Sequence, residues 1–147
     1  MVTTRRAATM LSLVVAVFIL CIGISYLVAP EAIASGFGLP VWPTDAAAAF
    51  SNLKGVRDAV TGLVVLALLG LGQRRALGVV MLVFALIPMG DMLTVLLHDG
   101  AAATAFGMHG LTALFVAFTG LLLLRGQPGD AVAAAGYPPA EIDPEEP

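Results

Sequence analysis

Charged side chains inside otherwise apolar stretches are the residues of this chain with the clearest capacity for chemistry. Lys54, Arg57 and Asp58 lie within one short segment at the head of a long apolar run, and Asp91 lies in a second apolar run. A charge at membrane depth is unfavourable unless it is paired. We therefore expect these two cations and two carboxylates to pair, with Lys54 or Arg57 within hydrogen-bonding reach of Asp91.

This set of charges is suited to acid–base chemistry. Two carboxylates beside cations can divide the roles of general base and general acid. Such a pair would suit water activation with acid-assisted opening of an epoxide, or proton transfer in the isomerisation or cyclisation of a lipophilic small molecule. We predict Asp58 and Asp91 as this pair without assigning which is the acid. Arg57 and Lys54 would orient them or stabilise an oxyanion, and His109 would relay protons.

The composition identifies the class of protein that must position these groups. Hydrophobic residues make up 59% of the chain and charged residues only 12%, with a mean hydropathy of +0.98, whereas about a quarter of residues are charged in soluble domains. We therefore expect an integral membrane protein of one domain. No basic patch suggests nucleic-acid binding, and the single Cys21 cannot form an internal disulfide.

Apolar stretches predict four membrane-spanning helices, each close to the roughly 20 residues that a span requires. They cover residues 7–28, 46–71, 76–97 and 103–124. A cleaved signal peptide is the alternative for the first stretch, since Ala32-Ile33-Ala34 resembles a cleavage site. The apolar run is too long for a signal peptide, whose apolar region spans about 7 to 15 residues, so we expect a retained helix.

The connections between these stretches carry their own signals. Residues 30–45 are rich in Pro and Gly and predict a structured loop or a short lid, after which Thr44 offers an N-cap for the second helix. The short connection at 72–75 predicts that the second and third helices are antiparallel neighbours. Pro88 should kink the third helix, because it lacks the N–H that would bond to Phe84.

Arginines orient the predicted bundle. In the four-span arrangement, the two loops on one side contain no Lys or Arg. The arginines of the terminal segments and of the central connection all fall on the other side: Arg5, Arg6, Arg74, Arg75 and Arg125. The sequence thus predicts an all-α, polytopic four-helix bundle in the cytoplasmic (plasma) membrane, with both termini cytoplasmic. Residues 1–125 would form this transmembrane domain, and 126–147 a disordered acidic tail.

Polar residues recur at helical spacing on each predicted span. Residues three and four apart share a helix face, and polar faces in a membrane turn away from lipid. We therefore predict a polar pocket that opens toward the extracytoplasmic side. Besides the five residues named above, its substrate-binding lining would comprise Asn52, Thr61, Thr94, His98, Thr112, Cys21 and Ser25.

Several of the same residues carry a resemblance to a known family. The runs are Gly55-Val56-Arg57-Asp58 with Gly62, Gly90-Asp91 leading to His98, and His109-Gly110. On these runs the chain, from residue 7 to 124, resembles the small four-helix membrane proteins of the family DUF4267, which are DoxX-like in general appearance. The resemblance implies a helical membrane fold. It implies no established activity, and it carries over no residue role.

Other interpretations of the charged residues stay open. The ion pairs could be structural, with Arg57 and Asp91 locking two helices together in a non-catalytic membrane subunit. A proton-coupled carrier is another alternative, although four spans would have to oligomerise to form a path. His98 and His109 could ligate haem, or a metal together with Asp91, but no dense ligand spacing supports this and we expect no cofactor and no metal. The expected partners are the lipid bilayer and a lipophilic small molecule, and a homo-oligomer is left open.

Overall fold

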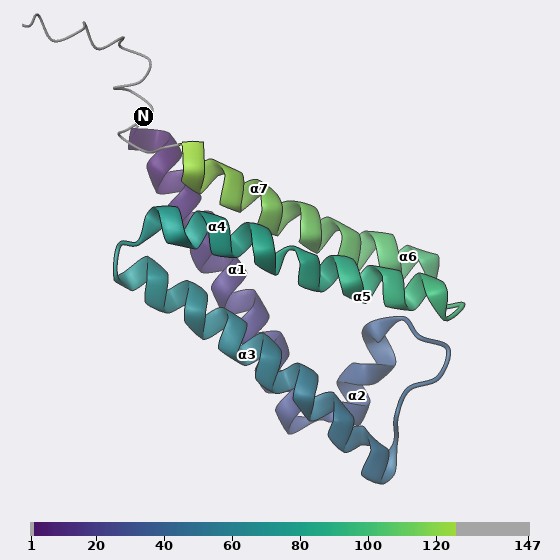
Figure 1. The fold of residues 1–147 in the computed structure, drawn as a ribbon. Helices are drawn as coiled ribbons and strands as arrows, with labels where there is room; N and C mark the ends of the chain where they lie inside the picture. The colour runs from purple at the N-terminus through teal and green to yellow at the C-terminus, as the bar shows by residue number, and fades with distance from the viewer. Residues whose placement is uncertain (1, 126–147) are drawn as a thin grey trace, which may run out of the picture.

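The fold was determined as a computed structural model, which describes residues 2–125; the predicted tail at 126–147 lies outside the described residues. All regular structure within 2–125 is helical (Figure 1). The long helices are α1 (Val2–Val28), α3 (Ala49–Gly70), α4 (Arg74–Phe84), α5 (Leu86–Leu97) and α7 (Leu111–Arg125). Short helical segments join them: α2 (Pro30–Ala34), η1 (Ser35–Phe37), η2 (Asp45–Ala48), α6 (Ala102–Thr104) and η3 (Ala105–Gly110).

The long helices form two closely packed pairs, α1 with α3 and α4 with α7 (Figure 1). Glycines allow the close approach in each pair. A Cβ placed on Gly23 of α1 would lie 2.8 Å from the carbonyl oxygen of Gly55 in α3, and a Cβ on Gly120 of α7 would lie 2.9 Å from the carbonyl oxygen of Gly78 in α4. Small residues at helix contacts are the usual means of packing helices in a membrane.

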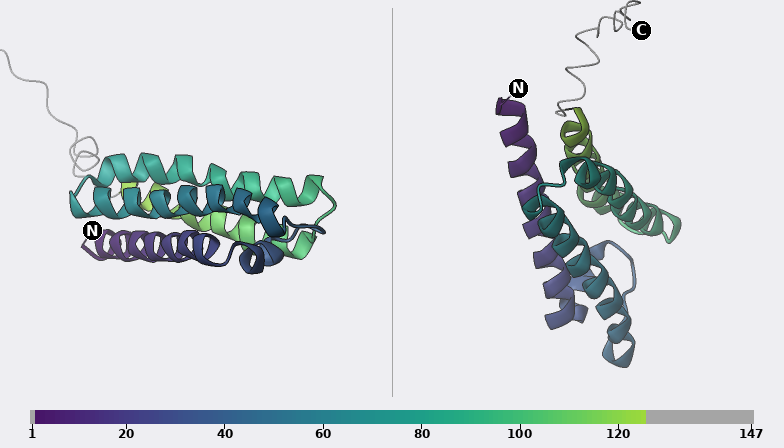
Figure 2. Two further views of the ribbon diagram at one scale, coloured as in Figure 1. Left: turned by 90° about the horizontal axis from the view of Figure 1, so that it is seen from below. Right: turned by 60° about the vertical axis from the view of Figure 1, so that its left-hand side comes forward.

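The two pairs meet at one end and diverge toward the other (Figures 1 and 2). They meet at a buried apolar core to which every long helix except α5 contributes: Ala8, Val15, Ala16, Val65, Leu77, Met81, Val116 and Leu123. The chain's N-terminus and the end of α7 lie at this same end. The packing core is therefore displaced from the end at which Lys54, Asp91 and His109 lie.

The outer surface of the bundle is suited to lipid. Large apolar side chains are exposed on every long helix, among them Leu63, Val83 and Phe118. Three helical segments among the described residues are long and apolar enough to cross a membrane: Thr4–Val28, Arg74–Leu97 and Ala102–Arg125. The predicted membrane-protein class is confirmed at this level. Helix α3 is long enough to span, but it carries Lys54, Arg57 and Asp58 within its first ten residues.

Breaks divide two of the predicted helices. The predicted 76–97 helix begins at Arg74 and is interrupted at Ala85, directly after the Phe84 carbonyl that Pro88 leaves without a partner; we had expected the irregularity nearer to Gly90 and Asp91. The predicted 103–124 helix contains the π-helical segment η3, which we did not expect. π-Helical turns within α-helices are often found at functional sites.

The segment before α3 differs from the expected loop. Residues Pro30–Ala34 and Ser35–Phe37 are helical, and Pro30 stands at the first turn of α2, where its missing N–H needs no partner. Thr44 occupies the N-cap position of η2, as expected, but its side chain makes no capping hydrogen bond. Instead, the backbone N–H of Asp45 donates to Oε1 of Glu31 at 2.7 Å. The second helix consequently starts with the 3-10 turn η2 and becomes α-helical at Ala49.

Candidate functional site

The four charged side chains form one cluster between α3 and α5. Nζ of Lys54 lies 2.8 Å from Oδ2 of Asp91 and 3.0 Å from Oδ2 of Asp58. Nε of Arg57 lies 3.0 Å from Oδ1 of Asp58, and its Nη2 lies 3.5 Å from Oδ2 of Asp91. Each carboxylate therefore contacts both cations, and the formal charges balance. The expectation that Lys54 or Arg57 reaches Asp91 is confirmed, with Lys54 making the shorter contact.

The two cations differ in position. Lys54 lines the central cavity together with Asp58 and Asp91, whereas Arg57 is not part of the cavity wall and its side chain is 42% exposed. Arg57 therefore holds the carboxylates from outside, while Lys54 faces the space that a ligand could occupy. Our sequence prediction gave both cations the same role, because helical spacing alone placed both near one face.

Aromatic rings complete the surroundings of Lys54. Its Nζ lies 5.4 Å from the ring centre of Tyr26 on α1 and 5.3 Å from that of Phe37 in η1. Cations at such distances are attracted to the negative face of the ring. The ammonium group is thus held by two carboxylates and two rings that come from four different segments.

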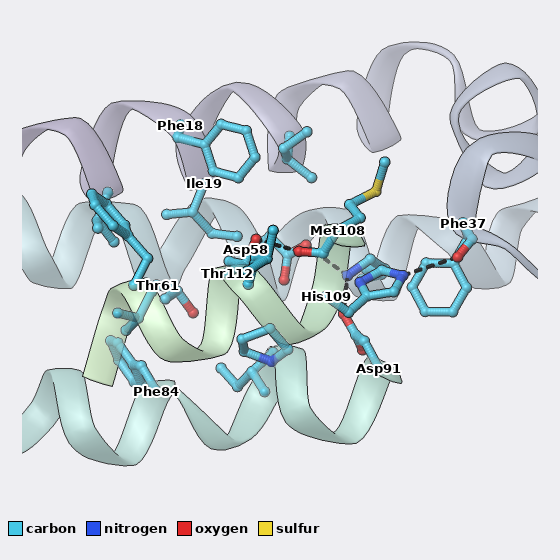
Figure 3. Close-up of a pocket in the computed structure, with 18 of the residues that line it drawn as sticks. Phe18, Ile19, Phe37, Asp58, Thr61, Phe84, Asp91, Met108, His109 and Thr112 are labelled. Carbon is cyan, nitrogen blue, oxygen red and sulfur yellow. Dashed lines mark hydrogen bonds and ion pairs between the residues drawn. The ribbon is translucent and has the colours of Figure 1, made fainter. Parts of the chain in front are cut away.

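The cavity lies between the two helix pairs and has a volume of about 790 Å³. This falls within the range of about 300–1,000 Å³ that is typical of small-molecule sites. Asp58 on α3, Asp91 on α5 and His109 on η3 converge on one part of it (Figure 3). The rest of its wall is mostly apolar and includes Val14, Phe18, Ile19, Val65, Met81, Phe84, Ile87, Phe115 and Val116.

Asp58 has an oxygen with remaining hydrogen-bonding capacity. Its side chain is 1% exposed, and Oδ2 has no partner with hydrogen-bond geometry, although Lys54 Nζ lies 3.0 Å away. At this oxygen the contact with Lys54 is therefore an ion pair without a hydrogen bond. Buried oxygens are nearly always hydrogen-bonded in folded proteins. An unsatisfied carboxylate oxygen beside a cavity is suited to accept a hydrogen bond from a bound molecule.

His109 joins the cavity to the segment before α3. Its Nε2 lies 2.9 Å from the carbonyl oxygen of Phe37, and the two rings stand 4.7 Å apart (Figure 3). Because a carbonyl oxygen can only accept, Nε2 carries the proton of this hydrogen bond. In the neutral ring Nδ1 is then an acceptor. The predicted proton relay stays a prediction, but this tautomer would allow Nδ1 to take up a proton.

The structure brings some of the predicted pocket residues together and separates others. Thr61 and Thr112 line the cavity with the charged cluster and His109. Asn52 instead lines a separate, smaller pocket near Pro30 and Asp45.

The remaining predicted lining residues lie outside the cavity. Cys21, Thr94 and His98 are exposed, and Ser25 donates its hydroxyl to the carbonyl of Cys21, so an inward-facing polar stripe at these positions was wrong. The side chains of Thr94 and Ser25 bond to carbonyls one turn back on their own helices, which satisfies them without a pocket.

The sequence analysis missed the two aromatic cavity residues that contact Lys54. Tyr26 is buried and lies on the same face of α1 as Ile19 and Ile22, so the apolar stripe of the first helix was a signal for it. Phe37 belongs to the segment that we expected to be a loop, and nothing in its local sequence indicates that it would reach His109.

Metal binding finds no support in the side-chain arrangement. Within residues 2–125, no three His, Cys, Asp or Glu side chains lie close enough to hold a metal ion. Nδ1 of His98 already lies 2.8 Å from the carbonyl oxygen of Thr94, and His98 does not approach His109 in the cavity wall.

Fold and site together define a helical membrane-type protein with an ionised cluster at one end of an apolar cavity. The family model described as "Domain of unknown function (DUF4267)" matches residues 16–123, and the chain belongs to this family. The resemblance that the charged runs indicated is thereby confirmed. No curated protein and no solved structure matches the chain.

Proposed function

We propose that this protein is a four-span membrane enzyme that performs general acid–base catalysis on a lipophilic small molecule. The observation that carries the proposal is the position of Lys54, Asp58 and Asp91, whose charged atoms contact one another at the edge of a mostly apolar cavity. Ion pairs that only fasten helices together need no cavity beside them. An apolar site with a few convergent polar groups is the usual form of a small-molecule site.

Hydrolysis of an epoxide is the reaction that uses these groups most completely. One carboxylate, Asp58 or Asp91, would take a proton from a water molecule as the water oxygen attacks an epoxide carbon. Because both carboxylates lie within 3.0 Å of Nζ of Lys54, the proton donor in this proposal is Lys54 and not the second carboxylate that we predicted from the sequence. Lys54 would donate a proton to the epoxide oxygen as the carbon–oxygen bond breaks, and the proton on the carboxylate would then return to Lys54. The product is a diol, and water is the only species consumed. Isomerisation or cyclisation would use the same base and the same donor.

The membrane topology is part of the proposal. Arg74 donates from Nη1 to Oγ1 of Thr9 at 2.8 Å and from Nη2 to the carbonyl oxygen of Arg5 at 3.0 Å, so the 72–75 connection is tied to the start of α1. Arg125 ends α7 at the same end of the bundle (Figure 1). This gathering of arginines supports the proposal that both termini are cytoplasmic, in which case the charged cluster would lie in the extracytoplasmic half of the bilayer.

The alternative that the cluster is structural is supported by one observation. The ion pairs of Lys54 and Arg57 with Asp91 connect α3 to α5 in the region where the two helix pairs diverge. In this case the protein would be a non-catalytic subunit, or a proton-coupled carrier, and the carboxylates would matter for stability alone. The two functions therefore predict different effects of the neutral isostere Asp91→Asn. A catalytic cluster would lose turnover, whereas a structural cluster would lose stability.

Turnover of a model epoxide tests the proposal. Membranes that contain the protein are incubated with a long-chain terminal epoxide in ¹⁸O-labelled water, and the diol is measured by mass spectrometry. We expect diol that carries one ¹⁸O atom. Asp58→Asn and Asp91→Asn should each lower the rate by about 10² or more, because one of the two carboxylates is the base and the other holds Lys54, the proton donor, in position.

Asp99→Asn is the matched control. Asp99 is an exposed aspartate in the turn after α5 with a φ of +55°, a conformation that Asn also tolerates. It should leave turnover unchanged. If the long-chain epoxide were not hydrolysed, or if the Asp58 and Asp91 variants kept the wild-type rate, catalysis by this cluster would be refuted.

A further inference from the structure

The wall of the cavity is open on one side and closed on the other. On the side between α1 and α7, its lining residues Val14, Phe18, Leu111 and Phe115 are 39% to 61% exposed. On the side between α3 and α5, the contact of Lys54 with Asp91 crosses the gap at 2.8 Å. The opening defined by Val14, Phe18, Leu111 and Phe115 is called the portal below.

In the proposed membrane topology, the portal would face the hydrocarbon of the bilayer rather than water. It lies between Thr4–Val28 and Ala102–Arg125, two of the segments that are apolar enough to span a membrane. All four of its side chains are apolar. A molecule that enters here therefore comes from among lipid acyl chains and needs an apolar body to do so.

The cavity is long in the direction of the bundle axis. Its lining on α1 runs from Val14 to Tyr26, which is about 18 Å at 1.5 Å per residue. Lys54 and His109 lie near the Tyr26 end, whereas Val14, Val65 and Val116 line the other end. This arrangement fits an extended apolar chain with one polar group at its end.

The charge balance of the cluster restricts the chemistry of that polar group. Two cations already face two carboxylates, so an anionic or cationic head would bring an unpaired charge into the membrane interior, which is unfavourable. An uncharged hydroxyl or ether oxygen adds no charge. Such an oxygen can accept from Nζ of Lys54, and a hydroxyl can also donate to the unsatisfied Oδ2 of Asp58.

We infer that the cavity binds an uncharged single-chain amphiphile, with one hydroxyl or ether oxygen at the Lys54–Asp58 end, and that this molecule enters from the bilayer through the portal. The inference rests on the proposed function for its membrane setting, and it names the class of substrate. It makes no use of the catalytic step, so binding can be measured separately from turnover.

Photo-crosslinking tests the inference on the full-length protein in nanodiscs of phosphatidylcholine. The probe is dodecanol that carries a diazirine near its methyl end, and the labelled residues are identified by mass spectrometry. We expect labels on cavity residues of α1 and α7. Unlabelled 1-dodecanol should compete at a concentration at least about tenfold lower than dodecyl sulfate or dodecyltrimethylammonium, each corrected for its bilayer content, because the charged heads have no partner.

Matched tryptophan substitutions test the portal. Leu111→Trp should narrow it and slow labelling severalfold, whereas Leu114→Trp should not, since Leu114 is equally exposed to lipid but does not line the cavity. A second pair of variants keeps the test valid if a tryptophan variant misfolds. Phe115→Ala should widen the portal and speed labelling, and Phe118→Ala, outside the cavity wall, should leave labelling unchanged.

Three results would overturn the inference. They are equal competition by the charged amphiphiles, equal effects of the Leu111 and Leu114 substitutions, and labels confined to lipid-exposed residues that do not line the cavity. Failure of the proposed catalysis looks different, because selective dodecanol binding without epoxide turnover would leave the inference intact. Asp91-dependent turnover without selective dodecanol binding would instead refute the inference alone.

Discussion

At the scale of single residues, Lys54 has the most contacts in the charged cluster. Lys54 and Arg57 each contact both carboxylates, but Lys54 makes the shorter contact with Asp91 and also lies over the rings of Tyr26 and Phe37. Arg57 approaches the cluster from a more exposed position. Removing one partner of a buried ion pair is far more costly than the pair is worth, because the other charge stays buried.

Lys54→Met should therefore destabilise the protein. Asp58 is almost fully buried and would keep only Arg57, so we expect a lower thermal unfolding midpoint, followed through the fluorescence of Trp42 in nanodiscs. The double variant Lys54→Met with Asp91→Asn should recover part of the loss, since it removes one of the two carboxylates. Additive losses in the double variant would show that Lys54 and Asp91 are not energetically coupled.

His109 carries a second residue-scale prediction. His109→Phe keeps a ring against Phe37 but removes the donor to its carbonyl oxygen, a bond worth about 0.5–1.5 kcal/mol. We expect amide hydrogen exchange in residues 35–44 to become faster, by up to about tenfold. The control His98→Phe alters an exposed histidine outside the cavity and should leave that exchange unchanged. Unchanged exchange in His109→Phe would mean that the contact does not hold the segment.

Helical spacing predicted the centre of this site and missed its surroundings. It placed Lys54, Asp58 and Thr61 on one face, and all three line the cavity. It failed for Thr94 and His98, which share a helical face with Asp91 by spacing but are exposed and do not line the cavity. The approach of Phe37 in η1 to His109 in η3 is a contact between segments far apart in the sequence, and the local sequence of neither segment predicts it.

At the scale of elements, helix breaks and small residues determine the geometry. Pro88 predicted an interruption of the third predicted helix, which lies at Ala85, because a missing N–H has a local and unavoidable effect. The π-helical segment η3 and the short helix α2 have no comparable signal. Both depend on packing against other segments, which the amino-acid sequence of the segment alone does not reveal.

The glycine contact between α1 and α3 can be tested by a matched pair of substitutions. Gly23→Ala places a Cβ against the backbone of Gly55 and Ala59, so we expect a destabilisation of about 1–3 kcal/mol from overpacking. Gly90→Ala puts the same methyl group into open space on α5 and should be neutral or stabilising, by up to about 1 kcal/mol. Thermal unfolding of both variants gives the comparison, and equal effects would argue against close packing at Gly23.

At the scale of the whole molecule, the two helix pairs join at an apolar core and diverge around the cavity (Figure 2). Composition and apolar run lengths were enough to predict a helical membrane protein. They could not predict this divergence, because it results from where large and small side chains meet across helices. The four-span count depends on whether α3 crosses the bilayer despite its three charges.

Accessibility of single cysteines tests that count. In a Cys21→Ser background, a membrane-impermeant maleimide should label Val41→Cys and Asp99→Cys in intact cells, and should label Gln73→Cys only after permeabilisation. These positions flank α3 and the α4–α5 segment, and all three are exposed. Labelling of Val41→Cys and Gln73→Cys from the same side would show that α3 does not span the membrane, and would refute the four-span topology that we propose.

The central claim is that Asp91 serves chemistry in the cavity and not merely the attachment of α5 to α3. The most direct measurement is epoxide turnover and thermal midpoint on the same preparation of Asp91→Asn. We predict a turnover that is lower by about 10² or more, in a protein that still inserts, remains folded and binds dodecanol. Unchanged turnover, with or without a lowered midpoint, would contradict the claim and identify the ion pairs as structural.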